Sequence, residues 1–262
     1  MEIGKIANCL QELGYRKLTD IQKKALMEAL REDKSMIIVA PTGSGKTEAA
    51  VFPVMLKIKA RNVNPIAAIY ITPLRALNRD IERRLNTIAT CFGINVGVRH
   101  GDTPLSIRKN ITRSPPHILI TTPESFNYII INEDIRHYLK NLEFIIIDEF
   151  RDLIESKRGL LFFTTLFFLE KVLGKRFFKV ALTATMHDDA IARKILSLDE
   201  QGDIELIRDP SLRKIEITVD IPVCRSDLCR DLNNIIKNED LAARVEEILN
   251  KIIQYKYFFV SL

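Results

Sequence analysis

The stretch that decides the fold of this 262-residue chain reads Met36-Ile37-Ile38-Val39-Ala40-Pro41-Thr42-Gly43-Ser44-Gly45-Lys46-Thr47. Its apolar start, Met36 to Val39, predicts a buried strand. The two glycines that follow give the backbone freedom, and a helix is predicted to begin at Lys46. A strand, a glycine-rich loop and a helix in this order are the context in which a phosphate-binding loop is expected.

The residues of this loop suit the phosphates of a nucleotide. Unpaired backbone N–H groups at a helix start converge on an anion, and the helix dipole adds partial positive charge. We expect Thr42 to Gly45 to surround the phosphates, Lys46 to reach the terminal ones, and Thr47 to offer its hydroxyl to Mg²⁺. Ala40 replaces the usual first glycine, and a plain glycine-rich turn with a surface lysine is the alternative interpretation.

The composition indicates a folded protein. Hydrophobic residues make up 47% of the chain and charged residues 28%, which argues against disorder. The formal net charge of +5 suits a polyanionic partner, but basic surfaces that bind nothing are common.

The four cysteines, Cys9, Cys91, Cys224 and Cys229, are scattered and have no metal-ligand spacing. We therefore expect no metal site made of cysteines. We expect the thiols to be reduced and the protein to be cytoplasmic. The N-terminus does not resemble a signal peptide. The most hydrophobic segment, Leu160 to Leu169, is too short to cross a bilayer.

Two helices are predicted in the first thirty residues. The first is expected to end at Gly14. Thr19 or Asp20 is expected to cap the second, which runs to about Leu30. The side chains predicted to point inward from the second helix are Ile21, Ala25, Leu26 and Leu30.

Tyr15 and Gln22 lie where these two helices meet. A glutamine amide carries both a donor and an acceptor, which matches the edge of an adenine, and an aromatic residue lies shortly before it. We interpret the pair as an adenine site. Tyr15 packed against the core and Gln22 exposed on a helix are the plainer alternatives.

Beyond the phosphate loop, apolar strands alternate with helical stretches, one of which is predicted from about Arg75 to Cys91. This pattern predicts an α/β fold with a mostly parallel sheet covered by helices on both faces. Ligands of such sheets bind beyond the carboxyl ends of the strands. The further strands are predicted at Ile66–Thr72, Asn95–Val98, His117–Thr121, Phe144–Ile147 and Phe177–Leu182.

Two acids, Asp148 and Glu149, follow the strand Phe144–Ile147, about a hundred residues after the phosphate loop. We expect Asp148 to hold Mg²⁺, and Glu149 to take a proton from the attacking water. Acids after a strand also cap the next helix, which is the structural alternative.

In this order the motifs resemble the first RecA-like, phosphate-loop domain of a superfamily 2 helicase of the DExH type. Gln22 stands where the Q motif lies, and the phosphate loop has the form of motif I, where alanine at the first position is normal. The later motifs correspond to Thr72–Leu77 for motif Ia, Thr121–Ser125 for motif Ib, Asp148–Glu149 for motif II and Thr183–Thr185 for motif III.

Three segments resemble the Lhr (large helicase-related) group in particular. The resemblance implies ATP as cofactor, with Mg²⁺, and ATP-driven 3′-to-5′ movement on single-stranded DNA or RNA with unwinding of duplexes. The segments are Arg99–Pro104, Ile118–Ser125 and Glu155–Gly159.

Motifs Ia and Ib predict the nucleic-acid contacts. Backbone N–H groups and hydroxyls at strand ends can hold phosphates without reading bases. Thr122 with Pro123 also fits the start of a helix, so a capping role is equally expected. The predicted contacts are Pro73, Leu74, Arg75, Arg99, Thr122, Pro123, Glu124 and Ser125.

Arg151 stands where DExH helicases carry histidine, a residue that couples the nucleotide site to motif III. Thr183 and Thr185 are the expected partners in this coupling. The alternative is that these β-branched side chains merely pack after the strand. Arginine is longer and always charged. We hypothesise that Arg151 weakens coupling, an idea that fails if Arg151→His leaves unwinding per ATP unchanged in a protein with both motor domains.

The expected organisation is a helical Q-motif region (1–31), a RecA-like ATP-binding domain (32–208) and a last part (209–262). Within that part, Arg213–Val223 reads as extended and Leu241–Ile253 as a long helix. Tyr257–Leu262 resembles the first strand of a second RecA-like domain. That domain supplies arginines to the phosphoryl group, so weak hydrolysis by this chain alone is expected.

Three function classes follow. The first is a nucleic-acid-stimulated ATPase motor domain. The second is a phosphate-loop NTPase of another kind, such as a transporter ATPase, against which motifs Ib and III argue. The third is a non-catalytic nucleic-acid-binding module that keeps the fold. No chemistry is assigned to the histidines, His100, His117, His137 and His187.

Overall fold

The computed structural model describes residues 2–73, 78–186, 188–198, 203–209, 226–238 and 241–246. The chain divides into two compact units, Met1–Ser211 and Leu212–Leu262. The first contains a sheet of seven strands, all parallel, with the order β3-β4-β2-β5-β6-β1-β7. The predicted α/β fold with a parallel sheet is confirmed.

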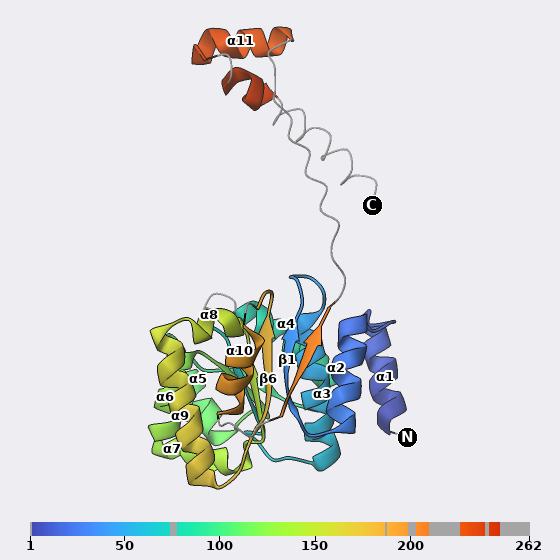
Figure 1. The fold of residues 1–262 in the computed structure, drawn as a ribbon, viewed down its shortest axis with the longest axis vertical. Coiled ribbons are helices and arrows are strands. Elements are labelled where there is room, and N and C mark those ends of the chain that lie inside the picture. Colours follow the sequence, from blue (N-terminus) through green and yellow to red (C-terminus); the bar gives the residue numbers. More distant parts are fainter. Residues whose placement is uncertain are drawn as a thin grey trace. The chain divides into compact units, whose positions relative to one another are not determined.

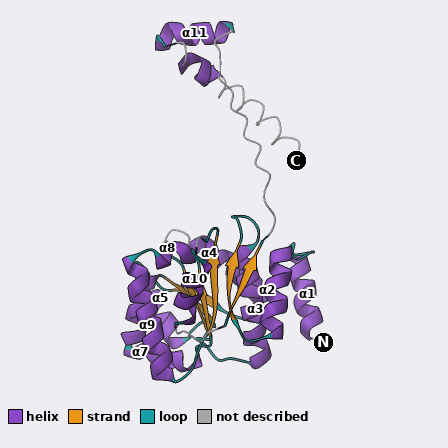
Figure 2. Cartoon of the chain, viewed as in Figure 1, coloured by secondary structure: helices purple, strands orange, loops and turns teal. Residues whose placement is uncertain are grey.

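The strands are β1 (Ser35–Val39), β2 (Ala68–Ile71), β3 (Val96–Val98), β4 (Ile118–Thr121), β5 (Phe144–Ile147), β6 (Phe178–Thr183) and β7 (Ile204–Arg208). Each strand predicted between Met36 and Leu182 is present, and β7 was not predicted. The arrowheads of the visible strands point to the same edge of the sheet (Figure 2).

One face of the sheet is covered by α1 (Glu2–Glu12), α2 (Asp20–Arg31), α3 (Lys46–Arg61) and α4 (Asn78–Thr90). The other face packs against α5 (Leu105–Arg113), α6 (Pro123–Ile131), α7 (Glu133–Arg136), α8 (Phe150–Ile154), α9 (Lys157–Leu173), α10 (Asp189–Ser197) and a 3₁₀ turn at His137–Asn141. Figure 1 shows α1, α2 and α3 on one side of the sheet, with α6 and α9 on the other.

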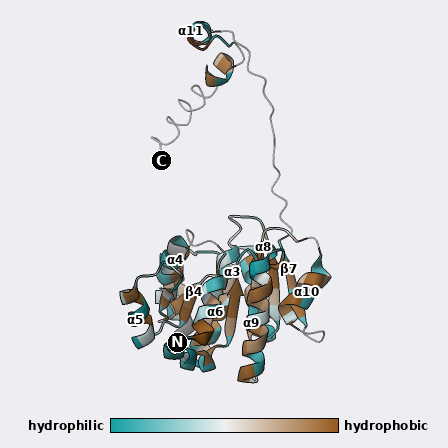
Figure 3. Cartoon of the chain, turned by 90° about the vertical axis from the view of Figure 1, so that its left-hand side faces the viewer, coloured by the Kyte–Doolittle hydropathy of each residue, from teal (hydrophilic) through white to brown (hydrophobic). Residues whose placement is uncertain are grey.

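Side chains alternate between these two faces along the central strands. In β5, Phe144 and Ile146 belong to the core under α1 to α4, whereas Ile145 and Ile147 belong to the core under α6 to α10. Burial on both faces explains why the strands are continuous apolar runs. The helices that cover them carry both hydrophobic and hydrophilic residues (Figure 3).

The predicted ends of the first helices are confirmed. Gly14 has a positive φ of 95° after α1, and Thr19 caps α2 through a reciprocal capping box with Gln22. The prediction that Leu30 points inward was wrong, because this side chain is 63% exposed and Ala29 is buried in its place. Leu26 is half-buried.

In the described part of the chain, no helix is long and apolar enough to cross a bilayer. The segment Leu160–Leu169 lies inside α9 and buries one side against the sheet.

The second unit contains α11 (Asp227–Ile236), which Ser226 caps by accepting from the backbone N–H of Cys229. Cys229 forms a small core with Ala242 and Ala243. Residues 241–246 are helical, in agreement with the start of the predicted long helix. The extended segment Arg213–Val223 and the terminal run Tyr257–Leu262 lie outside the described residues.

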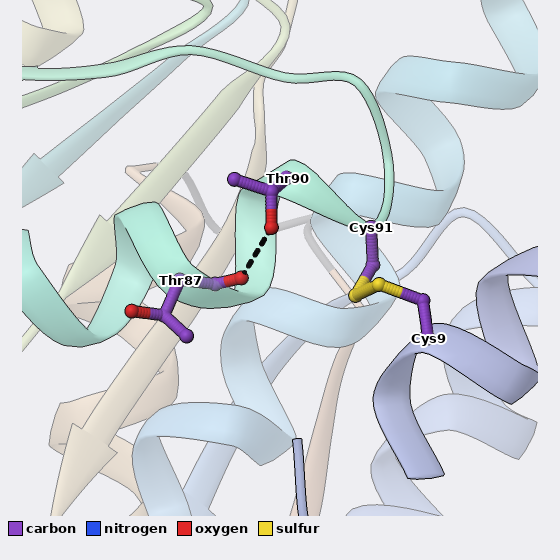
Figure 4. Close-up of a disulfide and its surroundings, with 4 residues drawn as sticks. All are labelled: Cys9, Thr87, Thr90 and Cys91. Carbon is purple, nitrogen blue, oxygen red and sulfur yellow. Dashed lines mark hydrogen bonds between the residues drawn. A yellow bond between two sulfur atoms is a disulfide. The ribbon is translucent and has the colours of Figure 1, made fainter. Parts of the chain in front are cut away.

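The expectation of reduced cysteines was wrong, because each of the described cysteines, Cys9, Cys91 and Cys229, is disulfide-bonded. Cys9 of α1 and Cys91, the residue after α4, form a disulfide with a Cα–Cα distance of 5.6 Å (Figure 4). Nearby, the Thr90 hydroxyl donates to the Thr87 carbonyl in the last turn of α4. The cross-link therefore holds the first helix against the helix that follows β2.

Removing this cross-link is expected to destabilise the first unit. The disulfide bridges residues 82 positions apart, and the Cys9→Ser, Cys91→Ser double variant should lose about 2–4 kcal/mol of unfolding free energy. Denaturant titration under non-reducing conditions measures the loss. A peptide map is the control, and separate alkylation of Cys9 and Cys91 without reductant would contradict the pairing.

Candidate functional site

The phosphate loop connects β1 to α3 at the carboxyl edge of the sheet. Gly43 and Gly45 have positive φ angles of 76° and 86°, a conformation that side chains other than glycine rarely adopt. The Ser44 hydroxyl donates to the Pro41 carbonyl at 2.8 Å and closes the turn. The first residue of the loop, Ala40, donates its N–H to the Thr183 carbonyl of β6 at 3.1 Å.

The N-terminal segment supports this loop from the side. The Thr19 hydroxyl donates to the Ser44 carbonyl at 3.2 Å, and the Gln22 amide donates to the Gly45 carbonyl at 3.4 Å. A Cβ on Gly45 would lie 2.3 Å from the Gln22 amide nitrogen, so only glycine leaves room for this contact.

Gln22 is therefore a residue that holds the phosphate loop. Its amide oxygen accepts from the Thr19 N–H at 2.9 Å, and its side chain is buried. An amide has one further hydrogen and one further lone pair, so contact with an adenine stays a prediction.

Tyr15 is half-buried and belongs to a polar cluster around the buried Glu48. Its hydroxyl donates to Glu48 Oε1 at 3.0 Å, Arg84 of α4 pairs with the same carboxylate, and its ring packs edge-on against Phe52. Burial and the Glu48 carboxylate raise the pKa of Tyr15. The packing alternative is what the structure shows for this ring, and a role for Tyr15 in binding adenine stays a prediction.

The paired acids lie at the same edge, two strands away from the phosphate loop. Asp148 follows β5 directly, and its Oδ1 accepts from the N–H of Glu149 at 3.0 Å. Its Oδ2 accepts from the hydroxyl of Tyr70, a fully buried residue of β2, at 2.7 Å. Burial and the Asp148 carboxylate raise the pKa of Tyr70, so the phenol keeps its proton and donates.

Glu149 has the backbone and the electrostatics of a functional residue. Its φ is 46°, a left-handed conformation that is uncommon outside glycine and that tends to occur at functional sites. Burial is the main cause that raises its pKa, with a further contribution from Asp148, whereas Lys46 lowers it. A carboxylate with a raised pKa is a better proton acceptor.

Arg151 connects motif II to motif III. It lies on α8, and its guanidinium donates to the Thr185 hydroxyl at 2.7 Å and to Glu155 at 3.0 Å. Thr183 in turn donates its hydroxyl to the Thr185 carbonyl at 2.8 Å. The two motifs are thus in contact through the arginine, and the coupling role of the three residues stays a prediction.

The segments of motifs Ia and Ib lie at the ends of β2 and β4. Thr122 caps α6 by accepting from the Ser125 N–H at 3.3 Å, Pro123 occupies the first turn, and the Thr122 side chain is buried. The capping role of Thr122 is confirmed, and its contact with phosphate stays a prediction. Leu74 and Arg75 lie outside the described residues.

Arg99 follows β3, beside the end of β4. Its carbonyl accepts from the Thr121 hydroxyl at 2.6 Å. Its Nη1 is buried without a hydrogen bond in the part of the chain that the structure describes. Burial and the charge of Arg108 lower its pKa. Arg99 is half-buried, and a buried guanidinium nitrogen without an acceptor favours an anion, which suits the predicted contact with phosphate.

Arg158, which was not predicted as a functional residue, ties these segments together. From the first turn of α9 it pairs with Glu124 of α6 and donates to the Pro73 carbonyl at 3.0 Å. The next residue is Gly159, where a Cβ would lie 1.8 Å from the Leu153 carbonyl oxygen. The sequence signal for Arg158 was the segment Glu155–Gly159, whose resemblance to the Lhr group predicted no role for this arginine.

A cavity of about 530 Å³ opens at the other edge of the sheet, at the amino ends of β1, β6 and β7. Among its charged residues, Lys34 pairs with Asp203 and Arg61 with Glu143. None of the sequence motifs lines this cavity, since the motifs lie at the opposite edge of the sheet.

A parallel sheet with a phosphate loop after β1 and paired acids after β5 defines a RecA-like phosphate-loop domain. The profile of the DEAD/DEAH box helicase family matches residues 19–193. The chain belongs to this family.

Named relatives agree. The ATP-dependent helicase Lhr-Core of Sulfolobus acidocaldarius is 34% identical over 223 residues, which cover 80% of this chain and 25% of that protein. The Lhr helicase/uracil glycosylase of Escherichia coli is 31% identical over 235 residues, which cover 82% of this chain and 15% of that protein. The chain therefore spans about a quarter or less of the length of these relatives.

Solved structures agree as well. The Mycobacterium smegmatis helicase Lhr bound to ssDNA and AMP-PNP superposes with a TM-score of 0.70 at 26% identity, covering 96% of this chain and 36% of that one. The structure of the DUF1998 helicase MrfA superposes with a TM-score of 0.71 at 25% identity, covering 98% of this chain and 41% of that one. The predicted resemblance to RecA-like helicase domains and to the Lhr group is confirmed.

Loss of Arg158 is expected to weaken binding of single-stranded DNA. Arg158→Ala leaves the Glu124 carboxylate uncompensated beside Pro73, where it repels phosphate, and a loss of roughly threefold to tenfold in affinity at low salt should follow. Fluorescence anisotropy measures it. Adding Glu124→Gln should restore most of the affinity, whereas an equal loss in both variants would show that Arg158 itself contacts the DNA.

Proposed function

We propose that this chain is the ATP-hydrolysing motor domain of a helicase that acts on single-stranded nucleic acid and on duplexes. The observation that carries the proposal is the meeting of four segments at one edge of the sheet: the phosphate loop, Asp148–Glu149, Thr183–Thr185 and the Pro73/Thr122 strand ends. The activity and the partners of the whole protein are part of this proposal.

The nucleotide phosphates bind to the loop between β1 and α3. Backbone N–H groups of the loop and the Lys46 ammonium neutralise their charge. The Glu149 carboxylate takes the proton of the attacking water, a task for which its raised pKa suits it. The Mycobacterium smegmatis structure, which contains AMP-PNP, supports a nucleotide at this place.

Thr47 and Asp148 fit Mg²⁺. Both offer oxygen ligands, and in the described residues no set of three His, Cys, Asp or Glu side chains could hold a metal ion. A small number of protein ligands matches Mg²⁺, which takes one or two protein oxygens together with phosphates and water. Bound there, Mg²⁺ would stabilise the charge that develops on the phosphates.

The nucleic acid binds beside β2, β4 and β3, where a buried guanidinium nitrogen of Arg99 has no acceptor among the described residues. Contacts of this kind hold the backbone and do not read sequence. The Mycobacterium smegmatis structure, which contains ssDNA, supports a single strand as ligand.

ATP hydrolysis with and without single-stranded DNA or RNA tests the proposal. We expect slow turnover that nucleic acid stimulates, that Lys46→Ala abolishes and that Glu149→Gln lowers by about 10²-fold or more, because the general base is lost. Glu149→Gln should still bind nucleotide, since it keeps the loop and Lys46.

Turnover that persists in Lys46→Ala would contradict the proposed site. Salt-sensitive binding of single strands without any turnover or nucleotide binding would instead favour the non-catalytic nucleic-acid-binding module.

A further inference from the structure

Tyr70 is a buried polar residue in an apolar row of the sheet. Its register partners are Ile120 in β4 and Ile146 in β5, and its side chain is fully buried. A tyrosine in such a place must find a partner for its hydroxyl, because an unpaired hydroxyl in the core costs free energy.

The partner that it finds is one of the predicted Mg²⁺ ligands. The hydroxyl donates to Asp148 Oδ2 at 2.7 Å.

A phenol that donates a hydrogen bond to a carboxylate fixes the orientation of that carboxylate. Asp148 is held at both oxygens, by Tyr70 at Oδ2 and by the Glu149 N–H at Oδ1. Each carboxylate oxygen keeps a further lone pair for a metal ion or its water.

We propose that Tyr70 is a positioning residue that aims Asp148 at the Mg²⁺ of the bound nucleotide. The proposal rests on the proposed function, since it presupposes a nucleotide at the phosphate loop. Partners behind metal ligands commonly change metal affinity by 10- to 100-fold when they are lost. The hydroxyl of Tyr70 is such a partner for Asp148.

The test separates metal binding from nucleotide binding. The affinity of a fluorescent ATP analogue is measured for wild type and Tyr70→Phe, each with Mg²⁺ and with EDTA. We expect equal affinities in EDTA, and a gain from Mg²⁺ that is about tenfold smaller in Tyr70→Phe. Absence of nucleotide binding in the wild type would overturn the proposed function itself, a result distinct from any outcome for Tyr70.

Tyr138→Phe is the matched control. It also deletes one phenol hydroxyl, which donates to the Thr112 carbonyl at 3.2 Å on another part of the fold, and it should leave the gain from Mg²⁺ unchanged. A gain in Tyr70→Phe equal to that of wild type, or an equal loss of affinity with and without Mg²⁺, would overturn the proposal.

A double-mutant cycle protects the test against a general loss of stability. In the Asp148→Asn background, Tyr70→Phe should cause no further loss of the gain from Mg²⁺, because the ligand that it positions is already changed. Independent losses in the two variants would show that Tyr70 acts through packing. The melting temperature without nucleotide confirms that each variant is folded.

Discussion

The parallel pairing of β5, β6 and β1 is the constraint on which the rest of the structure depends. Because β6 pairs with β1 on one side and β5 on the other, all three strands deliver their carboxyl ends to one edge. Neighbouring strands lie about 4.8 Å apart, which puts the phosphate loop and the paired acids about 10 Å from each other. That distance accommodates phosphates and a hydrated ion, and β6 brings motif III between them.

The chain holds this edge in place by polar contacts that come from distant segments. Thr19 and Gln22 hold the phosphate loop, Tyr70 connects β2 to the end of β5, and Arg158 connects motif Ia to motif Ib. Each contact removes freedom from a loop that would otherwise have few packing partners. The strained φ of Glu149 persists in such surroundings because the neighbouring elements hold its backbone.

Much of this fold is readable from the sequence, because strands buried on both faces leave apolar runs. β5 occurs at the predicted Phe144–Ile147 and β1 begins one residue before the predicted Met36. β7 escaped prediction because it is an edge strand whose Glu205 and Arg208 break the apolar run. Leu30 was misplaced because helical spacing alone does not say where the buried side of α2 ends.

What the sequence could not predict are contacts between residues far apart in the chain. The disulfide between Cys9 and Cys91 depends on α1 lying against the end of α4, and neither cysteine has a revealing neighbour. Tyr70 reads as one more apolar strand residue until the end of β5 is placed beside it. The phosphate loop and the paired acids were found because their chemistry is local, whereas the residues that position them act across the fold.

The central claim is that the loop between β1 and α3 binds ATP, and the binding of a fluorescent ATP analogue tests it most directly. Saturable binding that unlabelled ATP displaces, and that Lys46→Ala weakens by about tenfold or more, is the predicted result. Equal binding by wild type and Lys46→Ala, or none by either, would contradict the account.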